Sequence, residues 1–427
     1  MKKGSIEKAL IEGRFSESAY QRIKSFFKKV FKGVYRKKLF RRIDYWLAQP
    51  ARRRAAQREP INKRKIVLMT TRGSYNCNPR AIADEIIRQK LPWELVWVAR
   101  SENLNDLEQY PSQLRLVQRD SYEFYREAAQ AKVIIDNAMS YAFSGAYKKE
   151  GQIFCQTWHG SIGLKRFETS SEKRWIRQAT RSGKMTDYCF SNSTFETDLF
   201  NNTFWKTATI LETGHARNDI LLTQDKARIA EIRVRVMENL KIPEGVKIAL
   251  YAPTFRDNKK DMRPYAINYG RVKNALETRF GGEWVILSRL HFEIKSTLEN
   301  KRIKYPDCVI NATYYPDIQD LLLVADVGIT DYSSWICDFV LTRRPGFLFA
   351  TDMQDYYSER GFYFPLESTP FPLAESNAEM EENILSFDET AYQTRCEEFI
   401  RDKGCVDDGH AAERIVEKLK EIMEEAE

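Results

Sequence analysis

The sequence predicts an α/β protein with two doubly wound, Rossmann-like domains facing a cleft, preceded by a basic amphipathic helical extension. Three observations indicate this architecture. Short apolar runs alternate with helical stretches along most of the chain, which is typical of a parallel sheet with helices on both faces. The 427 residues exceed the usual size of one domain. Basic residues concentrate before residue 66, in a segment with helical periodicity.

The first domain is predicted over residues 64–225. Its strands are expected where apolar runs precede polar loops, and a helix is expected between the first two, over residues 79–89. The strand candidates are residues 65–70, 94–99, 131–136 and 152–157.

The second domain is predicted over residues 226–405 and opens with a charged helix at residues 226–240. The remaining residues, 406–427, are expected to form an acidic amphipathic helix that packs back across the domains. Strands of the second domain are expected at residues 247–252, 284–288, 308–311, 324–329 and 346–350.

The extension is predicted over residues 1–63, and it carries the positive charge of the chain. Residues 22–65 contain 17 Lys and Arg against two acidic residues, whereas the whole chain has a net charge of +8. Residues 1–21 add +1, so residues 66–427 carry −8. Within the extension, apolar residues recur at helical spacing between Ile23 and Val34, with lysines on the other faces.

This amphipathic pattern predicts that residues 16–47 lie on an anionic membrane surface, where basic and aromatic side chains both contribute. Two alternatives are packing of the aromatic residues against the domains, and nucleic-acid binding. We expect no nucleic acid, because the rest of the chain is acidic. No run of 18 apolar residues or apolar signal core occurs. The expected location is therefore cytoplasmic, peripheral on the inner face of the cell membrane.

Residues 330–338 place two serines where a buried strand, expected within the apolar run 321–329, turns into a helix. A helix N-terminus presents unpaired N–H groups and the positive end of its dipole, which suits a diphosphate. We therefore predict that Ser333 and Ser334 bind phosphate. Asp338, about one turn later, is expected to accept hydrogen bonds from a ribose. The alternative is that these residues only cap the helix.

His159 lies in a Trp158-His159-Gly160 loop after an expected strand, where open α/β sheets place their ligands. A histidine has a pKa near neutrality and can take a proton from an attacking hydroxyl. His159 is therefore a candidate for this base, with Trp158 and Gly160 in support. The alternative is a histidine with a structural hydrogen bond.

Six short motifs follow one another in this chain, and together they resemble the CDP-glycerol glycerophosphotransferase family of teichoic acid primases and polymerases. The resemblance covers about residues 153–364. It implies the GT-B arrangement of two domains around an active cleft, with residues 64–225 on the acceptor side and residues 226–405 binding the CDP-alcohol. The motifs are Trp158-His159-Gly160, Gly214-His215-Ala216-Arg217-Asn218-Asp219, Tyr251-Ala252-Pro253-Thr254-Phe255-Arg256-Asp257, Arg289-Leu290-His291, Thr330-Asp331-Tyr332-Ser333-Ser334 and Arg360-Gly361-Phe362-Tyr363.

The resemblance implies that His291 contacts the phosphates of CDP-glycerol and joins His159 as a catalytic residue. Arg256 suits the diphosphate because its planar fork binds oxygens in pairs. Arg289 and Asp331 complete the predicted CDP-alcohol site, although Arg289 has the alternative of pairing with a nearby carboxylate.

Arg217 and Asp219 are predicted as supporting residues. An Arg-Asn-Asp run can form an internal ion pair and a helix cap. We favour that structural role over direct contact with the substrate.

The implied reaction transfers a polyol phosphate, most simply glycerol phosphate, from a CDP-alcohol to a hydroxyl of a polyprenyl-diphosphate-linked or cell-surface glycan, with release of CMP. We expect no cofactor and no metal, although Asp331 is a possible ligand of a divalent ion. The seven cysteines lack CxxC spacing, which argues against a zinc site or disulfide framework. Two other functions are a GT-B glycosyltransferase that uses a nucleotide sugar and a non-catalytic membrane adaptor.

Overall fold

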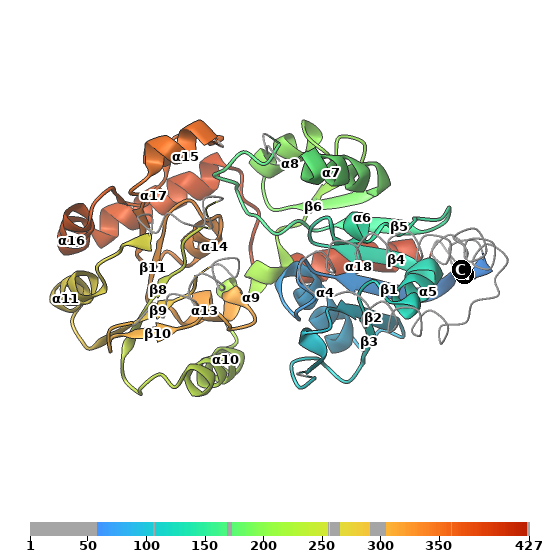
Figure 1. Ribbon diagram of the computed structural model, residues 1–427, viewed down its shortest axis with the longest axis horizontal. Helices are drawn as coiled ribbons and strands as arrows, with labels where there is room; N and C mark the ends of the chain where they lie inside the picture. Colours follow the sequence, from blue (N-terminus) through green and yellow to red (C-terminus); the bar gives the residue numbers. More distant parts are fainter. Residues whose placement is uncertain are drawn as a thin grey trace, which may run out of the picture.

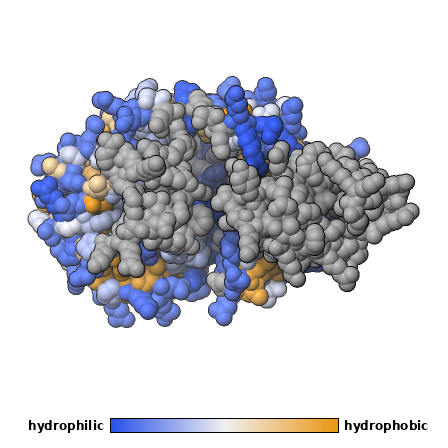
Figure 2. Space-filling view, in the orientation of Figure 1, coloured by the Kyte–Doolittle hydropathy of each residue, from blue (hydrophilic) through white to orange (hydrophobic). Residues whose placement is uncertain are grey.

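The computed structural model describes residues 58–105, 107–168, 173–254, 256, 265–290, 305–359 and 361–424. In this part of the chain, two α/β lobes lie side by side (Figure 1). In the view of Figure 2 the surface is recessed between the lobes, and the uncovered residues in this recess are hydrophilic. The predicted amphipathic helix and its membrane contact at residues 16–47 lie outside the described residues.

The first lobe contains a parallel sheet in the order β3-β2-β1-β4-β5-β6-β7. Four of these strands were predicted, and β3, β6 and β7 were missed. Strands β3 and β7 lie at the sheet edges and have few buried residues. The strands are β1 Asn62–Met69, β2 Glu94–Ala99, β3 Leu114–Gln118, β4 Ala131–Asp136, β5 Ile153–Gln156, β6 Tyr188–Ser191 and β7 Thr209–Glu212.

The helices of the first lobe include one from the C-terminal end of the chain. Helix α18, Ala411–Glu424, packs against α4, and its apolar face joins the core around Ile66 and Leu68 of β1 (Figure 1). The expected return of this helix across the domains is therefore seen. The other helices here are α4 Cys77–Arg88, α5 Tyr122–Gln130, α6 Ser140–Ser144, α7 Lys173–Met185, α8 Thr194–Asn201 and α9 Asp219–Leu222, with 3-10 turns η1 Asn103–Asn105 and η2 Ala216–Asn218.

The second lobe contains a parallel sheet in the order β10-β9-β8-β11-β12-β13. The strands are β8 Lys247–Tyr251, β9 Trp284–Ser288, β10 Val309–Asn311, β11 Val327–Thr330, β12 Gly346–Phe349 and β13 Leu373–Ala374. The helices are α10 Lys226–Leu240, α11 Tyr269–Phe280, α13 Ile318–Val324, α14 Trp335–Phe339, α15 Met353–Glu359, α16 Asn377–Leu385 and α17 Glu389–Asp402, with 3-10 turns η5 Val340–Thr342 and η6 Leu366–Ser368.

One strand prediction was wrong in its extent. The apolar run 321–329 is not a single strand, because its first part belongs to helix α13 and only Val327 onward forms β11. Asp317 starts the helix by accepting a hydrogen bond from the Gln319 N–H at 3.1 Å. A short apolar run fits a buried helix as well as a strand.

Each sheet has a topological switch point, where the order of successive strands reverses. It lies between β1 and β4 in the first lobe and between β8 and β11 in the second. Ligands of open α/β sheets bind outside the carboxyl ends of the strands at such points. The loop after β5 pairs with a loop of the other lobe, where Arg166 N–H donates to Gly361 O at 3.2 Å and Tyr363 N–H to Leu164 O at 3.0 Å. The two lobes are thus in direct contact next to the expected site.

Candidate active site between the two lobes

His159 follows β5 and is held through one ring nitrogen. Its Nδ1 lies 2.7 Å from the backbone carbonyl oxygen of Asn137, which directly follows β4. A carbonyl can only accept, so Nδ1 carries the proton and Nε2 keeps its lone pair. Nε2 makes no hydrogen bond within the described residues, and the side chain is exposed. This geometry leaves Nε2 available to accept a proton.

The surroundings of His159 favour the neutral imidazole. Desolvation by the packed loop lowers its pKa to about 4, and the nearby charges of Arg217 and Lys165 act in the same direction. The ring also touches solvent, so water offsets part of the desolvation without changing the direction of the shift. The His159 imidazole is therefore expected to be neutral at pH 7 and able to accept a proton.

Trp158 and Gly160 shape the loop that carries His159. Trp158 has a φ of 52° and packs its indole against Trp205 and Phe167, with ring centroids 5.2 and 5.3 Å away. A Cβ on Gly160 would lie 2.7 Å from the indole nitrogen of Trp158. A side chain at position 160 would therefore displace the tryptophan or the loop.

Asn78, in the first turn of α4, joins three pieces of chain near His159. Its side-chain amide donates to the carbonyl oxygens of Thr157 and Trp158 at 2.9 and 3.2 Å, and its Oδ1 accepts from Arg217 N–H at 3.0 Å. The sequence analysis missed both Asn78 and Asn137. Asn137 acts on His159 through its backbone, which no residue pattern indicates.

Ser333 and Ser334 lie where β11 gives way to α14, as predicted. Ser334 is the N-cap residue, but its side chain makes no capping hydrogen bond. Neither serine hydroxyl has a hydrogen-bond partner within the described residues, and both side chains are only half-buried. Side-chain capping therefore does not explain the serines, and their hydroxyls remain available to a ligand at the second switch point.

Arg256 and Asp331 belong to a buried charge cluster at the same switch point. The guanidinium of Arg256 lies 2.8 Å from Asp331 Oδ2 and 2.6 Å from Asp352 Oδ2. Burial opposes its charge, but these carboxylates outweigh burial and raise the pKa of Arg256. Asp331 also accepts the Thr254 N–H at 2.7 Å, which ties the loops after β8 and β11 together. Both residues are engaged with each other, so a direct phosphate contact remains a prediction.

Arg289 follows β9, and its guanidinium faces backbone oxygens rather than a carboxylate. It donates to the carbonyl oxygens of Tyr315 and Ala312, the latter at 3.4 Å. Desolvation lowers the pKa of Arg289 to about 10, against the attraction of Asp317. His291, the other predicted catalytic residue, lies outside the described residues.

Arg217 joins the His159 loop to the second lobe. It donates to Asp338 through Nε at 3.0 Å and Nη2 at 3.1 Å, and Nη2 also donates to Gly160 O at 2.6 Å. Asp219 accepts from the N–H groups of Ala411 and Ala412, at the start of α18, at 3.0 and 2.7 Å. The ion pair and the helix cap expected from the Arg-Asn-Asp run are therefore both present.

These contacts give no support to the predicted ribose contact of Asp338. Its carboxylate is buried and also accepts from Asn218 at 3.0 Å and Gln319 at 3.3 Å. With both oxygens used between the lobes, we assign Asp338 to lobe positioning instead.

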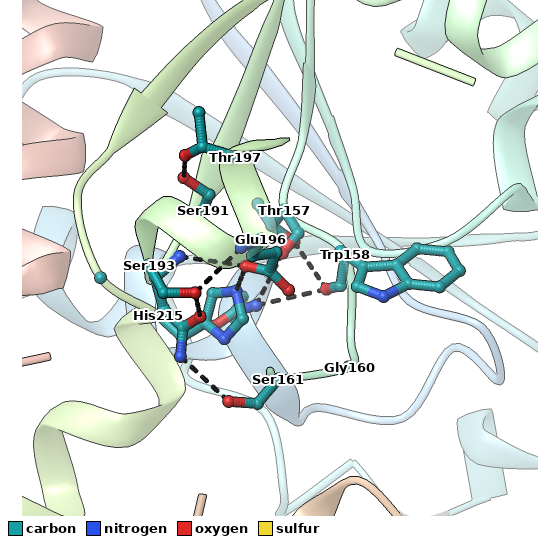
Figure 3. Close-up of polar contacts among 12 residues, drawn as sticks. Thr157, Trp158, Gly160, Ser161, Ser191, Ser193, Glu196, Thr197 and His215 are labelled. Atoms are coloured by element: carbon teal, nitrogen blue, oxygen red, sulfur yellow. Dashed lines mark hydrogen bonds and ion pairs between the residues drawn. The ribbon is translucent and has the colours of Figure 1, made fainter. Parts of the chain in front are cut away.

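A second buried polar cluster lies behind the His159 loop (Figure 3). His215 Nε2 and Glu196 Oε2 are 2.9 Å apart. Asp407 accepts from His215 N–H at 2.7 Å and from Asn192 at 2.8 Å, and the Asn192 amide also donates to Ser161 Oγ at 2.9 Å. The cluster fixes Ser161, two residues after His159, through residues distant in the sequence. The sequence analysis missed Asn192 and Asp407.

Within the described residues, no group of three or more His, Cys, Asp or Glu side chains is arranged to hold a metal ion. A search of these residues for helices long and apolar enough to cross a membrane also finds none. Among the described residues, the predicted site groups on the two lobes are the His159 imidazole, the Ser333 and Ser334 hydroxyls beside the N-terminus of α14, and buried arginines.

Comparison with known proteins agrees with the motif series. Residues 52–421 match the family model described as CDP-glycerol:poly(glycerophosphate) glycerophosphotransferase. A teichoic acid poly(glycerol phosphate) polymerase of Staphylococcus epidermidis is 29% identical over 82% of this chain and 50% of the relative. This chain thus spans about half the length of that polymerase. A teichoic acid glycerol-phosphate transferase of Staphylococcus aureus is 28% identical, covering 84% of this chain and 93% of the relative.

A solved structure of the wall teichoic acid polymerase TagF, soaked with CDPG, superposes with a TM-score of 0.74 at 26% identity. The match covers 93% of this chain and 100% of the solved one. The two parallel-sheet lobes therefore share the TagF-like arrangement that the motif series implied. Because the family model matches most of the sequence, this chain belongs to the CDP-glycerol:poly(glycerophosphate) glycerophosphotransferase family.

Proposed function

We propose that this protein transfers glycerol phosphate from CDP-glycerol to a hydroxyl of a lipid-linked or cell-surface glycan and releases CMP. The acceptor oxygen forms a bond to the phosphorus that carries glycerol, and the bond from that phosphorus to the bridging oxygen of the diphosphate breaks. The observation that carries the proposal is His159, whose Nδ1 is fixed on the Asn137 carbonyl 2.7 Å away while Nε2 stays available.

In this mechanism His159 Nε2 takes the proton of the acceptor hydroxyl as the oxygen attacks. Ser333 and Ser334, with the helix N-terminus beside them, are placed to bind the phosphates of the donor on the opposite lobe. The lobes hold donor and acceptor in line, which removes much of the entropic cost of bringing them together. Arg289, whose guanidinium faces backbone oxygens, supplies positive charge to the donor side. Arg256 would contact the phosphates only by turning part of its guanidinium from Asp331 and Asp352 to the donor.

The choice of glycerol as the polyol is supported by the names of the two relatives described above, a glycerol phosphate polymerase and a glycerol-phosphate transferase. Ribitol-phosphate enzymes also match this chain, among them a teichoic acid ribitol-phosphate polymerase of Staphylococcus aureus, 25% identical over 84% of this chain and 69% of the relative. The shape of the donor pocket decides which polyol length is accepted, so both donors belong in the test.

The test is acceptor-dependent release of CMP from CDP-glycerol and from CDP-ribitol, measured with a polyprenyl-diphosphate disaccharide as acceptor. We expect CMP from CDP-glycerol only when the acceptor is present. If CMP forms from CDP-ribitol and not from CDP-glycerol, the donor is CDP-ribitol instead. If CMP forms from neither, the proposed phosphotransferase activity is rejected. A nucleotide-sugar donor under the same conditions covers the glycosyltransferase alternative.

We also propose that the protein binds the inner face of the cell membrane through residues 16–47. The support is the amphipathic and basic pattern of that segment, which suits anionic lipid. Flotation with phosphatidylglycerol vesicles should recover the full chain and lose the chain that begins at residue 48. Equal flotation of both would contradict this attachment.

A further inference from the structure

Helix α7 carries an unusual concentration of positive charge on the first lobe. Its 13 residues include five basic side chains and no acidic one, although residues 66–427 together carry −8. All but Arg181 are exposed, and none of the five forms an ion pair within the described residues. We call this set, together with Phe143 and Tyr147, the α7 surface; its basic members are Lys173, Arg174, Arg177, Arg181 and Lys184.

Two aromatic side chains organise the α7 surface. Phe143 and Tyr147, from α6 and the loop after it, are each 37% exposed. The guanidinium of Arg174 lies over the Phe143 ring at 5.5 Å, and that of Arg181 over the Tyr147 ring at 5.7 Å. Arg181 also donates to Ala146 O at 2.7 Å. Stacking orients the Arg174 guanidinium while leaving its edge N–H groups for an anion. Arg181 is held more firmly, since it also donates to Ala142 O at 3.3 Å.

The α7 surface is structurally continuous with the catalytic loop. On the inner face of α7, Trp175 packs on Phe204 with ring centroids 5.6 Å apart, and Phe204 contacts Trp205 at 6.1 Å. Trp205 in turn packs on Trp158, the neighbour of His159. On the other side, α6 begins three residues after Asn137, whose carbonyl holds His159. Helix α7 is therefore packed, through these aromatic residues, against the loop that carries His159.

The spacing of the charges suits a repeating anion. Arg174, Arg177, Arg181 and Lys184 follow one another at intervals of three or four residues, which places neighbours about 5–6 Å apart along one face. A poly(glycerol phosphate) chain carries one negative charge for every six backbone bonds, a comparable distance. Several phosphates of one chain can thus meet successive cations of α7.

We propose that the α7 surface binds the phosphodiester backbone of the acceptor chain and guides its free end to His159. This inference rests on the proposed function, since it names the partner of the same site. Lipid is the less favoured partner, because the apolar residues of α7, Trp175 and Ile176, are half-buried and its exposed positions are charged or polar. A membrane-surface helix instead exposes a broad apolar face.

The test uses the full chain and a lipid-free, fluorescently labelled poly(glycerol phosphate), with binding measured by anisotropy at low and high salt. The variant R174Q/R177Q/K184Q removes three exposed charges whose side chains form no hydrogen bond or ion pair within the described residues, and of which only Arg174 stacks on Phe143. K226Q/R228Q/R395Q removes three exposed cations on the second lobe and is the matched control. R177Q alone, compared with R177K, covers the case in which the triple variant folds poorly.

We expect the α7 variant to bind the polymer about tenfold more weakly, most clearly at low salt, while the control and R177K bind like the parent. The KM for a long acceptor should rise, and the KM for CDP-glycerol and for a single-unit primer should not. Equal polymer binding by parent and variant would overturn the inference. Loss of binding to phosphatidylglycerol vesicles alone would overturn it in favour of lipid.

The outcome is separable from that of the proposed function. Anisotropy needs neither donor nor turnover, so polymer binding can be lost in the variant even when no CMP appears with the parent. Conversely, normal CMP release by the parent together with unchanged polymer binding by the variant would support the transferase and reject the proposed role of the α7 surface.

Discussion

Replacing His159 with alanine is expected to lower acceptor-dependent CMP release by a factor of about 10² to 10⁴, the usual contribution of a positioned general base. The imidazole is the base in our account because its Nδ1 is committed to the Asn137 carbonyl and its Nε2 faces solvent at the cleft. The measurement is the initial rate of CMP formation with saturating CDP-glycerol.

His410 provides the control for this prediction. It is also exposed, but it pairs with Glu413 at 3.0 Å on α18, away from the cleft. His410→Ala should retain the rate and the thermal midpoint of the parent. A His159→Ala protein that is as active as His410→Ala would contradict the assignment of the base.

The pH dependence of kcat/KM tests the role of His159 in a second way. Since the pKa of His159 is lowered, the proton-accepting neutral form persists as the pH falls through 6.5, the ordinary histidine value. The value of kcat/KM should therefore stay level from pH 7 to about 5.5 and fall only at lower pH. A fall centred near pH 6.5 that disappears in His159→Ala would contradict the shift.

Replacing Arg217 with methionine is expected to destabilise the protein by about 3–5 kcal/mol, because it leaves the buried Asp338 carboxylate without its cation. The two side chains are each 4% exposed and are joined by two hydrogen bonds. Asp338→Asn, which keeps the shape of the acceptor, should destabilise in the same direction by leaving Arg217 buried and unpaired. Urea unfolding measures both effects.

A surface pair is the control for Arg217. Arg343 and Glu397 are 3.3 Å apart with side chains 52% and 60% exposed, and exposed pairs contribute about 0–1 kcal/mol. Arg343→Met should therefore change stability by less than about 1 kcal/mol. If Arg217→Met lowers the free energy of unfolding by as little as Arg343→Met does, the contact between the lobes contributes little to stability.

Arg217 should also affect catalysis through geometry. It bonds the Gly160 carbonyl on one side and Asp338 on the other, so it connects the His159 loop to the helix that follows Ser333 and Ser334. Below the unfolding range of denaturant, Arg217→Met should lower kcat more than it raises the KM for donor, as expected for a positioning residue.

The central strands and the site loops were predictable from the sequence for a simple reason. β1, β4, β8 and β9 are buried runs of apolar residues bounded by polar loops, so composition alone indicates them. The edge strands β3 and β7 bury little surface. They depend on pairing with a neighbour rather than on their own residues, and single-sequence patterns do not record that pairing.

The contact partners of the site residues could not be predicted as well from the sequence. The motifs located His159, Arg217 and the two serines, but the Asn137 contact uses a backbone oxygen. Asp407 reaches the cluster behind the His159 loop from nearly two hundred residues away in the chain, since it is 192 positions from His215. Such contacts arise only when α18 and the segment before it fold back onto the first lobe. The ribose role expected for Asp338 found no support because Arg217 and Asn218, about 120 positions earlier in the chain, occupy its carboxylate.

The most direct test of the central claim is the ³¹P spectrum of the product formed from CDP-glycerol and the lipid-linked acceptor. The proposed phosphotransfer predicts a new phosphodiester signal that grows in step with CMP and requires both acceptor and His159. Consumption of acceptor without a new phosphodiester, or with release of a nucleoside diphosphate, would show that the protein transfers something other than a polyol phosphate.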